Sequence, residues 1–195
     1  MALNKGPILK RARALGIEPQ VLGVNKKSNR NPGRGMGKMS EYGSQLREKQ
    51  KAKFIYGMQE KQFRTLFGIA AKMPGITGEN LLQLLELRFD NVVYRMGFAK
   101  TRNEAKQLIS HGHFLLNGKK VDIPSYRLSA DDVVSVRERS KNKDLFKSTD
   151  DKAWNQAQWL SVDAEKLEGK VVSLPQREDI DFEIEERLIV ELYSK

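Results

Sequence analysis

The stretch of sequence that decides the fold reads LRFDNVVYRMGFAKTRNEAKQLISHGHFLLNGKKVDIPSYRLSADDVVSVRE, from Leu87 to Glu138. Near its centre, residues 101–104 (TRNE) have the spacing of a capping box, in which a hydroxyl and a carboxylate satisfy backbone N–H groups at the start of a helix. Apolar residues then recur at Ala105, Leu108 and Ile109, three and four positions apart. This spacing places them on one face, so the sequence predicts an amphipathic helix here.

Elements on both sides of this helix extend the pattern to a small folded module. An earlier helix is predicted over residues 90–96, with Asp90 as its N-cap. Beyond the central helix, Asn117-Gly118 is typical of a type I′ turn and predicts a β-hairpin. An edge strand near 126–128 and a strand at 133–136 are expected to follow. The predicted module is therefore two helices packed on a small antiparallel sheet.

The rest of the chain divides into further parts. Residues 1–43 are basic, contain several glycines and are expected to be largely irregular. Residues 44–87, together with about 170–195, are expected to form a helical domain closed by the C-terminal segment. Residues 88–169 are expected to hold the module and its C-terminal connection. The predicted fold class is α+β: a mainly helical domain with an inserted small α/β module and a basic N-terminal extension.

Charge is distributed unevenly along the chain. The net charge is +10 and the sequence pI about 9.7. Residues 1–64 contribute +11, residues 65–140 contribute +3 and residues 141–195 contribute −4. A basic balance favours a polyanionic partner, and nucleic acid is favoured over a membrane surface because no signal peptide, lipid anchor or long apolar run is evident. We expect a soluble intracellular protein without a membrane partner.

Cysteine is absent, which excludes disulfides, thiol catalysis and cysteine-based zinc sites. His111 and His113 have no carboxylates nearby at a ligand spacing, and two histidines cannot form a structural metal site alone. The same lack of partners argues against a role as catalytic acid and base. We expect no metal and no cofactor.

The helix that begins at Arg102 has one apolar face, so Arg102, Lys106 and Ser110 are expected to point outward on another face. Lys119 and Lys120, beside the hairpin turn, could lie on the same surface. Proteins contact A-form RNA duplexes mainly through phosphates, 2′-hydroxyls and shape, and cations with small donors suit that task. An ordinary solvated helix face fits the same spacing equally well. Spacing alone therefore does not decide between them.

A resemblance to a known family adds to this interpretation. The stretch from Leu87 to Glu138 resembles the RNA-binding module named after small-subunit ribosomal protein four. That module also occurs in pseudouridine synthases, a tyrosine-charging tRNA synthetase and a heat-shock protein, so alone it implies only RNA binding. Three further segments resemble the bacterial ribosomal family itself: SEYGSQLREKQKAKFIYGMQEKQFRTLF (Ser40 to Phe67), WLSVDAEKLEG (Trp159 to Gly169) and ERLIVELYSK (Glu186 to Lys195). NKGPILKRARALG (Asn4 to Gly16) resembles the start of the family.

The chain departs from the family pattern at two places. Many members hold zinc with cysteines near the N-terminus, and no zinc is expected here because this chain has no cysteine. The stretch NPGRGMGK (Asn31 to Lys38) resembles the corresponding family loop only in part. A Walker loop needs four residues between its glycines and a hydroxyl after its lysine, and this stretch has neither. We interpret it as a basic loop whose glycines allow close approach to RNA phosphate.

Residues and resemblance together give a set of candidate RNA ligands. Within the module they are Arg88, Asn91, Arg95, Lys100, Thr101, Arg102, Lys106, Gln107, Ser110, His111, Asn117, Lys119 and Lys120. In the N-terminal part they are Lys10, Arg11, Arg13, Arg34, Lys38, Arg47, Lys51 and Arg64. The pair of substitutions Arg102→Glu and Lys106→Glu is expected to weaken RNA binding while preserving the fold.

The C-terminal part carries carboxylates that would repel RNA. The candidates for a protein contact are Glu178, Asp179, Glu183, Glu185 and Glu186. A solvated acidic face also explains them. The resemblance implies a neighbouring small-subunit protein, ribosomal protein five, at an interface associated with decoding fidelity, where carboxylates could meet a basic partner.

The resemblance implies a structural constituent of the small ribosomal subunit and not an enzyme. It would bind 16S rRNA, organise a multihelix junction of the 5′ domain early in assembly, contribute to translational accuracy and lie near the path by which messenger RNA enters. Its location would be the cytoplasmic ribosome or an organellar ribosome. The alternative is an RNA-modifying enzyme or a stress-related RNA binder with the same module. Such an enzyme needs a separate catalytic domain, and the remaining residues contain no recognisable catalytic constellation.

Overall fold

The computed structural model describes residues 6–24, 26, 39–142, 146 and 157–194. Its contacts divide the chain into two compact units. The first combines Met1–Leu82 with Asp181–Lys195, and the second is Gln83–Ile180. The second unit is wider than the module predicted over 88–169, because it extends to Ile180. Helix α4 (Thr77–Glu86) crosses the boundary between the units.

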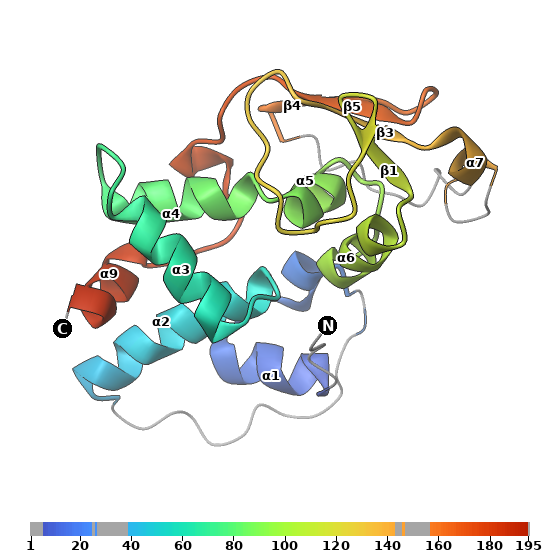
Figure 1. Ribbon diagram of the computed structural model, residues 1–195. Coiled ribbons are helices and arrows are strands. Elements are labelled where there is room, and N and C mark those ends of the chain that lie inside the picture. Colours follow the sequence, from blue (N-terminus) through green and yellow to red (C-terminus); the bar gives the residue numbers. More distant parts are fainter. Residues whose placement is uncertain (1–5, 25, 27–38, 143–145, 147–156, 195) are drawn as a thin grey trace. The chain divides into compact units, whose positions relative to one another are not determined.

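The second unit contains several short helices and an antiparallel sheet (Figure 1). Its elements are α5 (Phe89–Arg95), α6 (Arg102–Ser110), β1 (Phe114–Leu116), β2 (Lys119–Lys120), β3 (Val133–Val136), α7 (Glu138–Lys141), β4 (Leu160–Asp163), β5 (Glu168–Val171) and the 3₁₀ helix η2 (Arg177–Asp179). The strand order is β2-β1-β3-β5-β4. This architecture confirms the predicted α+β class with a small α/β module.

Helix α6 and the β1–β2 hairpin form where local signals predicted them. The Thr101 hydroxyl accepts a hydrogen bond from the Glu104 N–H at 3.1 Å, so Thr101 is the N-cap. The Glu104 carboxylate accepts from the Lys100 N–H at 2.6 Å, one residue earlier than in a capping box. In the hairpin, Asn117 and Gly118 have φ of 49° and 76°, as a type I′ turn requires.

Helix α5 begins one residue earlier than predicted, with Arg88 and not Asp90 as its N-cap residue. The N–H groups of Phe89 and Asp90 donate to the backbone oxygens of Tyr126 and Pro124, at 2.8 and 3.0 Å. The predicted strand at 126–128 is therefore wrong, since this segment forms one bridge, Arg88 to Arg127, and its backbone instead satisfies the start of α5.

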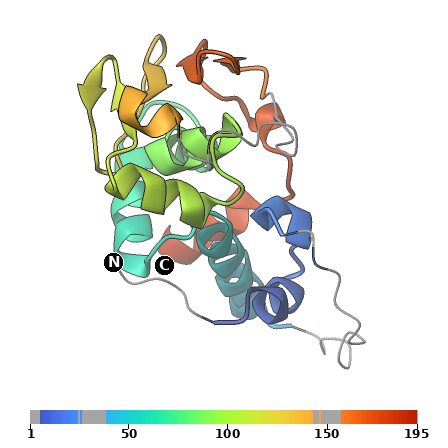
Figure 2. The same ribbon diagram turned by 90° about the vertical axis from the view of Figure 1, so that its right-hand side faces the viewer.

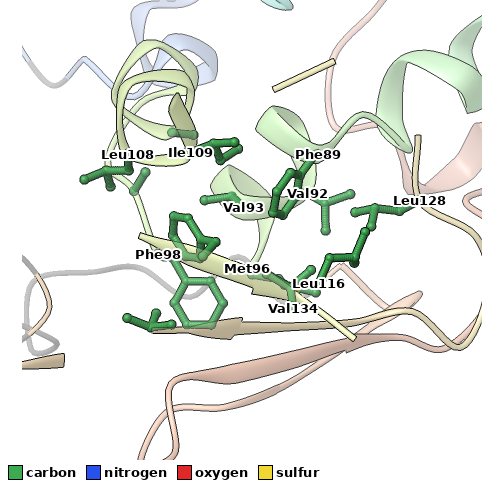
Figure 3. Close-up of a cluster of buried hydrophobic side chains, with 14 of the residues drawn as sticks. Phe89, Val92, Val93, Met96, Phe98, Leu108, Ile109, Leu116, Leu128 and Val134 are labelled. Carbon is green, nitrogen blue, oxygen red and sulfur yellow. The ribbon is translucent and has the colours of Figure 1, made fainter. Parts of the chain in front are cut away.

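The core of the second unit lies between the two helices and one face of the sheet (Figure 3). Helix α5 contributes Val92 and Val93, α6 contributes Leu108 and Ile109, and Val134 of β3 faces them, each 5% exposed or less. Alternation places the other side chains of the strands on the opposite face. The core thus fixes α5 and α6 against the sheet, and this sets which side chains reach solvent.

Strands β4 and β5 were not predicted. They pair with each other, and β5 also pairs with β3, more than thirty residues earlier in the chain. Gly169 of β5 lies directly against Met96, and a Cβ atom there would lie 2.6 Å from the Met96 sulfur. A larger residue at position 169 would require the Met96 side chain to shift.

The first unit is helical in the part of the chain that the structure describes. Its elements are α1 (Ile8–Leu15), the 3₁₀ helix η1 (Pro19–Leu22), α2 (Glu41–Ile55), α3 (Glu60–Ala70), the first residues of α4, and α9 (Glu186–Ser194). Helix α1 lies beside α2, as both views show (Figures 1 and 2). Helix α1 and η1 add two short ordered elements to the extension expected to be largely irregular. Gly16 and Gly23 end them with φ of 69° and 71°.

Helix α9 packs against α2 within this unit, so the end of the chain joins the N-terminal helices. Phe67 stacks on Tyr193 with ring centroids 4.6 Å apart, and Tyr56 meets Phe182 edge to face at 5.8 Å. Ile189 of α9 is fully buried. Aromatic and aliphatic burial thus stabilises the position of α9.

Candidate nucleic-acid interface

The start of α6 is more buried than its sequence predicted. Arg102 was expected to point outward, but its side chain is buried and only 6% of the residue is exposed. Its Nε donates to the Asn91 side-chain oxygen at 2.7 Å, and its guanidinium lies 4.3 Å from the centre of the Tyr94 ring. The expectation failed because α5 covers this face of α6 with polar and aromatic partners.

Glu86, at the end of α4, is the centre of a buried polar network. Its carboxylate accepts from the Asn91 amide at 2.6 Å and from Nε and Nη2 of Arg95, both at 3.0 Å. Glu86, Asn91 and Arg95 are each at most 3% exposed. Buried charges are tolerated when they are paired and hydrogen-bonded in this way. Asn91 and Arg95, predicted RNA ligands, are therefore occupied inside the protein.

A second charged group surrounds Asp90. Arg88 donates to its carboxylate through Nε and Nη2, at 3.1 and 2.8 Å. The Lys106 ammonium lies 3.7 Å from the same carboxylate, and the Lys106 side chain is 11% exposed. Burial lowers the pKa of Lys106 and so, to a lesser degree, do the charges of Arg88 and Arg102, while Asp90 acts in the opposite direction. Lys106 is thus a largely covered cation beside the Asp90 carboxylate.

Other predicted ligands of the module are exposed. Lys119 and Lys120 form β2 at one edge of the sheet, and both are open to solvent. Lys100 is exposed just before the Thr101 cap of α6. Exposed lysines on an edge strand are accessible to a polyanion.

The remaining predicted ligands of the module differ in exposure. Gln107 and His111 are exposed, whereas Ser110 is partly covered and its hydroxyl is buried. Asn117 is exposed, but its side chain is used locally. It donates to Asp132 at 2.8 Å and accepts from the Val133 N–H at 2.9 Å, which holds the turn against β3.

In the first unit, α1 carries three of the predicted cations on its exposed surface. Lys10, Arg11 and Arg13 are all exposed. The Arg11 guanidinium lies 5.1 Å from the ring centre of Phe54, on α2, so Arg11 also helps to hold α1 in place. Helix α1 thus presents cations on an ordered element of a segment that was expected to be irregular.

Helices α2 and α3 carry the other described candidates of this unit. Arg64 is exposed, whereas Lys51 is partly covered and lies 3.7 Å from Glu48. The Nε of Arg47 is buried without a hydrogen-bond acceptor among the described residues. Arg34 and Lys38 lie outside the described residues.

Two other lysines of α2 converge on Glu60 of α3. Lys49 and Lys53 lie 2.9 and 2.6 Å from its carboxylate, and the Tyr193 hydroxyl donates to it at 2.9 Å. Partial burial would raise the pKa of Glu60, but hydrogen bonds from Lys53, Lys49 and Tyr193 outweigh it and lower the pKa to about 2. These lysines therefore serve internal structure.

The acidic candidates are divided between the units. Glu178 and Asp179 belong to the second unit, and Glu183, Glu185 and Glu186 to the first. The Asp179 carboxylate is used locally, since it accepts from the Gln176 N–H at 2.6 Å in the capping box of η2. Glu178, Glu183 and Glu185 are exposed.

The carboxylates that organise the module were not predicted as such from the sequence. Glu86 and Asp90 each bind an arginine at ion-pair distance, and Tyr94 supports a third arginine. The sequence shows Asp90 two positions after Arg88 and Glu86 nine positions before Arg95. It does not show that both carboxylates are buried, because their burial depends on how α5 packs.

Neither a metal site nor a membrane span is found in the described part of the chain. No cluster of three or more His, Cys, Asp or Glu residues with metal-binding geometry occurs among the residues described. The helices in the described ranges are too short or too polar to cross a bilayer.

Two protein-family models match consecutive parts of this sequence. The sequence model of the S4 domain matches residues 87–134, and that of the ribosomal protein S4/S9 N-terminal domain matches residues 4–86. The first match covers α5, α6, the β1–β2 hairpin and the first residues of β3, and the second covers most of the helical first unit. Together they cover more than half of the chain.

Curated relatives agree over the full length. The small ribosomal subunit protein uS4 of Agathobacter rectalis is 54% identical over 197 residues, and that of Lachnoclostridium phytofermentans is 55% identical over 200 residues; in both, all of this chain and all of the relative are covered. The protein of the same name from Fusobacterium nucleatum is 51% identical over 196 residues, again with full coverage of both chains. These names are those of a ribosomal protein and not of an RNA-modifying enzyme, which confirms the predicted family and the non-enzymatic class. The chain belongs to the family of small ribosomal subunit protein uS4.

Proposed function

We propose that this chain is a structural protein of the small ribosomal subunit that binds 16S rRNA through its module and through cations of its helical unit. The observation that carries the proposal is the contrast within the second unit between buried and exposed cations. Arg88 and Arg95 are held by buried carboxylates, whereas Lys119 and Lys120 are exposed at the sheet edge, where the Lys120 ammonium lies 3.7 Å from the exposed Asp122. The family relationship supports the same function.

Binding would rest on charge neutralisation and shape. Each lysine that neutralises a phosphate releases condensed counterions, so affinity falls as salt rises. The β1–β2 hairpin and the start of α6 provide exposed cations on elements that a common core holds, so their spacing is fixed before RNA arrives. A rigid array of cations suits recognition of an A-form surface by phosphate and 2′-hydroxyl contacts. In the first unit, Lys10, Arg13 and Arg64 would add phosphate contacts.

Finer assignments belong to the same proposal. The protein would organise a multihelix junction of the 5′ domain of 16S rRNA early in assembly, lie near the path of incoming messenger RNA and contribute to translational accuracy. The exposed carboxylates Glu178, Glu183 and Glu185 would meet a basic neighbour, ribosomal protein five. Its place in the cell would be the ribosome of the cytoplasm.

Footprinting of purified 16S rRNA with the full chain at several salt concentrations tests the proposal. We expect protection clustered at one multihelix junction of the 5′ domain, weakening as salt rises. Equal protection of unrelated RNAs at the same protein concentration would reject the specific ribosomal function. Protection that does not depend on salt would reject the phosphate-based mechanism.

A matched pair of double variants tests which cations are involved. Lys119→Ala with Lys120→Ala removes two exposed charges at the β2 edge. Lys166→Ala with Lys170→Ala removes the same charge from β5 and the preceding turn, where the lysines pair with Asp163 and Asp131. We expect only the first pair to weaken binding by more than about tenfold. Equal losses would mean that net charge and not the module surface determines affinity.

A further inference from the structure

Glu86 is a buried carboxylate that cannot itself touch RNA. It is 1% exposed, and its negative charge would repel a phosphate. Its two oxygens accept hydrogen bonds from Asn91 and from both Nε and Nη2 of Arg95. This set of contacts joins the last residue of α4 to two successive turns of α5. Glu86 can therefore affect RNA binding only by positioning other residues, and not by contacting RNA itself.

Asn91 links Glu86 to α6 through a second hydrogen bond. The Asn91 amide nitrogen donates to the Glu86 carboxylate at 2.6 Å and to the Glu86 backbone oxygen at 3.0 Å. With its nitrogen held there, the Asn91 oxygen must face the other way, and it accepts from Arg102 Nε at 2.7 Å. A side-chain amide has two different ends, so fixing one end fixes the other. The carboxylate of Glu86 thereby selects the orientation that can accept from Arg102.

Arg102 is the first residue of α6 and lies next to the exposed Lys100 and the Thr101 cap. It is held on one side by Asn91 and on another by the face of the Tyr94 ring. Since only 6% of Arg102 is exposed, a ligand can reach it only in the conformation that these partners impose. The orientation of its guanidinium edge is therefore set from within the protein.

We propose that Glu86 is a positioning residue for RNA recognition, which acts through Asn91 on Arg102 and the start of α6. This inference rests on the proposed RNA-binding function. For the substitution of Glu86, the proposal predicts a change in RNA affinity opposite in direction to the change expected from net charge alone. Removing a negative charge from a protein that binds a polyanion should strengthen binding, whereas removing a positioning group should weaken it.

The matched variants are Glu86→Gln and Glu165→Gln. Both raise the net charge by one, and both residues lie in the second unit, but Glu165 is exposed in the turn between β4 and β5. We expect Glu165→Gln to leave affinity for a 16S rRNA fragment unchanged or slightly higher. We expect Glu86→Gln to lower it by about tenfold, the scale of a hydrogen bond to a charged group. Glu86→Gln with affinity equal to that of Glu165→Gln would overturn the proposal.

Glu86→Gln leaves Arg95 without its buried counter-ion and could reduce folding. Asn91→Ala is the second variant, because it breaks the link to Arg102 while the pair of Glu86 and Arg95 remains. The Nε–H resonances of Arg95 and Arg102 in the NMR spectrum of the free protein report each contact separately. In Asn91→Ala we expect the Arg102 Nε–H to exchange faster with water while that of Arg95 stays protected, with RNA affinity again about tenfold lower.

A double-mutant cycle separates positioning from a general loss of stability. In an Arg102→Ala background, Asn91→Ala should have no further effect on affinity, because the residue on which Asn91 acts is gone. A merely structural role would lower affinity by the same factor in both backgrounds, and that result would overturn the proposal. If the unaltered protein fails to bind the fragment, the proposed function fails. If it binds and Asn91→Ala binds equally well, only the positioning of Arg102 is rejected.

Discussion

Glu60 should contribute pH-dependent stability to the first unit, and the substitution Glu60→Gln measures it. The Glu60 carboxylate is contacted by Lys49 and Lys53 of α2 and by the Tyr193 hydroxyl of α9. These hydrogen bonds outweigh the effect of burial and lower its pKa from 4.5 to about 2. One carboxylate thus joins three helices, and its charge is what the lysines and the tyrosine hydroxyl recognise.

The magnitude follows from the difference in pKa between the folded and unfolded states. The fall in the pKa of Glu60 from 4.5 to about 2 corresponds to about 3 kcal/mol at neutral pH if no charge is screened. The Glu60 side chain is 45% exposed, however, and pairs that reach solvent are worth much less. We therefore expect Glu60→Gln to lower the free energy of unfolding by about 1–1.5 kcal/mol at pH 7.

The sign of the pH dependence is fixed by the lowered pKa. The folded state binds the proton on Glu60 more weakly than the unfolded state does, so the stabilisation is complete above about pH 4.5 and is lost as pH falls towards 2. Urea unfolding at pH 7, 4, 3 and 2.5, followed by circular dichroism, gives the difference between the unaltered protein and Glu60→Gln. We expect that difference to shrink steadily across this range.

Two further variants make the result interpretable. Glu18→Gln removes an exposed carboxylate of the same unit that forms no ion pair within the described residues, and it should change stability by less than about 0.5 kcal/mol at every pH. Tyr193→Phe keeps the stacking on Phe67 and removes only the hydroxyl, so it should reproduce part of the Glu60→Gln effect. A difference between Glu60→Gln and the unaltered protein that stays constant from pH 7 to 2.5 would refute the reasoning, because an uncharged cause does not titrate.

Three further predictions concern the module. Thr101→Ala removes the hydroxyl that accepts from Glu104 N–H and should lower the free energy of unfolding by about 1 kcal/mol in urea melts, whereas Thr101→Ser should not. Asn117→Ala puts alanine, which lacks the polar side chain that lets asparagine tolerate the left-handed region, at a φ of 49°. It also removes two side-chain hydrogen bonds, so it should cost about 2 kcal/mol, and a loss below about 0.5 kcal/mol would contradict this account of the turn. Lys119→Ala with Lys120→Ala should reduce the slope of log affinity against log salt by about 1–2 in filter binding, and an unchanged slope would exclude these lysines as phosphate ligands.

The parts of the fold that could be predicted from the sequence are those whose signals are local. The hydroxyl of Thr101 and the Asn117-Gly118 pair act within three or four residues, so α6 and the β1–β2 hairpin form where they were expected. Strands β4 and β5 were missed because β3, which pairs with β5, lies far away in the chain and because each of the two strands has only four residues. Helix α5 was predicted with the wrong N-cap because backbone oxygens of a distant loop replace a side-chain cap.

Residue identity alone could not distinguish contact residues from organising residues. Helical spacing correctly separated the apolar stripe of α6 from the face that carries Arg102 and Lys106, but it could not reveal that α5 packs over part of that second face. The charge of Arg102 is the same whether it faces solvent or Asn91. Lys119 and Lys120, by contrast, are exposed. They follow a tight turn at the edge of the sheet, where no element covers them in the described structure.

This distinction changes how a charge reversal in the module should be interpreted. Arg102→Glu with Lys106→Glu was expected to weaken RNA binding and preserve the fold. In the structure, a glutamate at 102 would face the Asn91 oxygen, which needs a donor, and one at 106 would face Asp90. Both substitutions bury an unpaired negative charge, which typically costs about 3–5 kcal/mol when a buried partner is lost. A loss of RNA binding in that variant would therefore indicate a loss of structure. Changing the charge of the exposed hairpin tests a direct contact with RNA. Changing the charge at the start of α6 instead tests the polar network that positions α6.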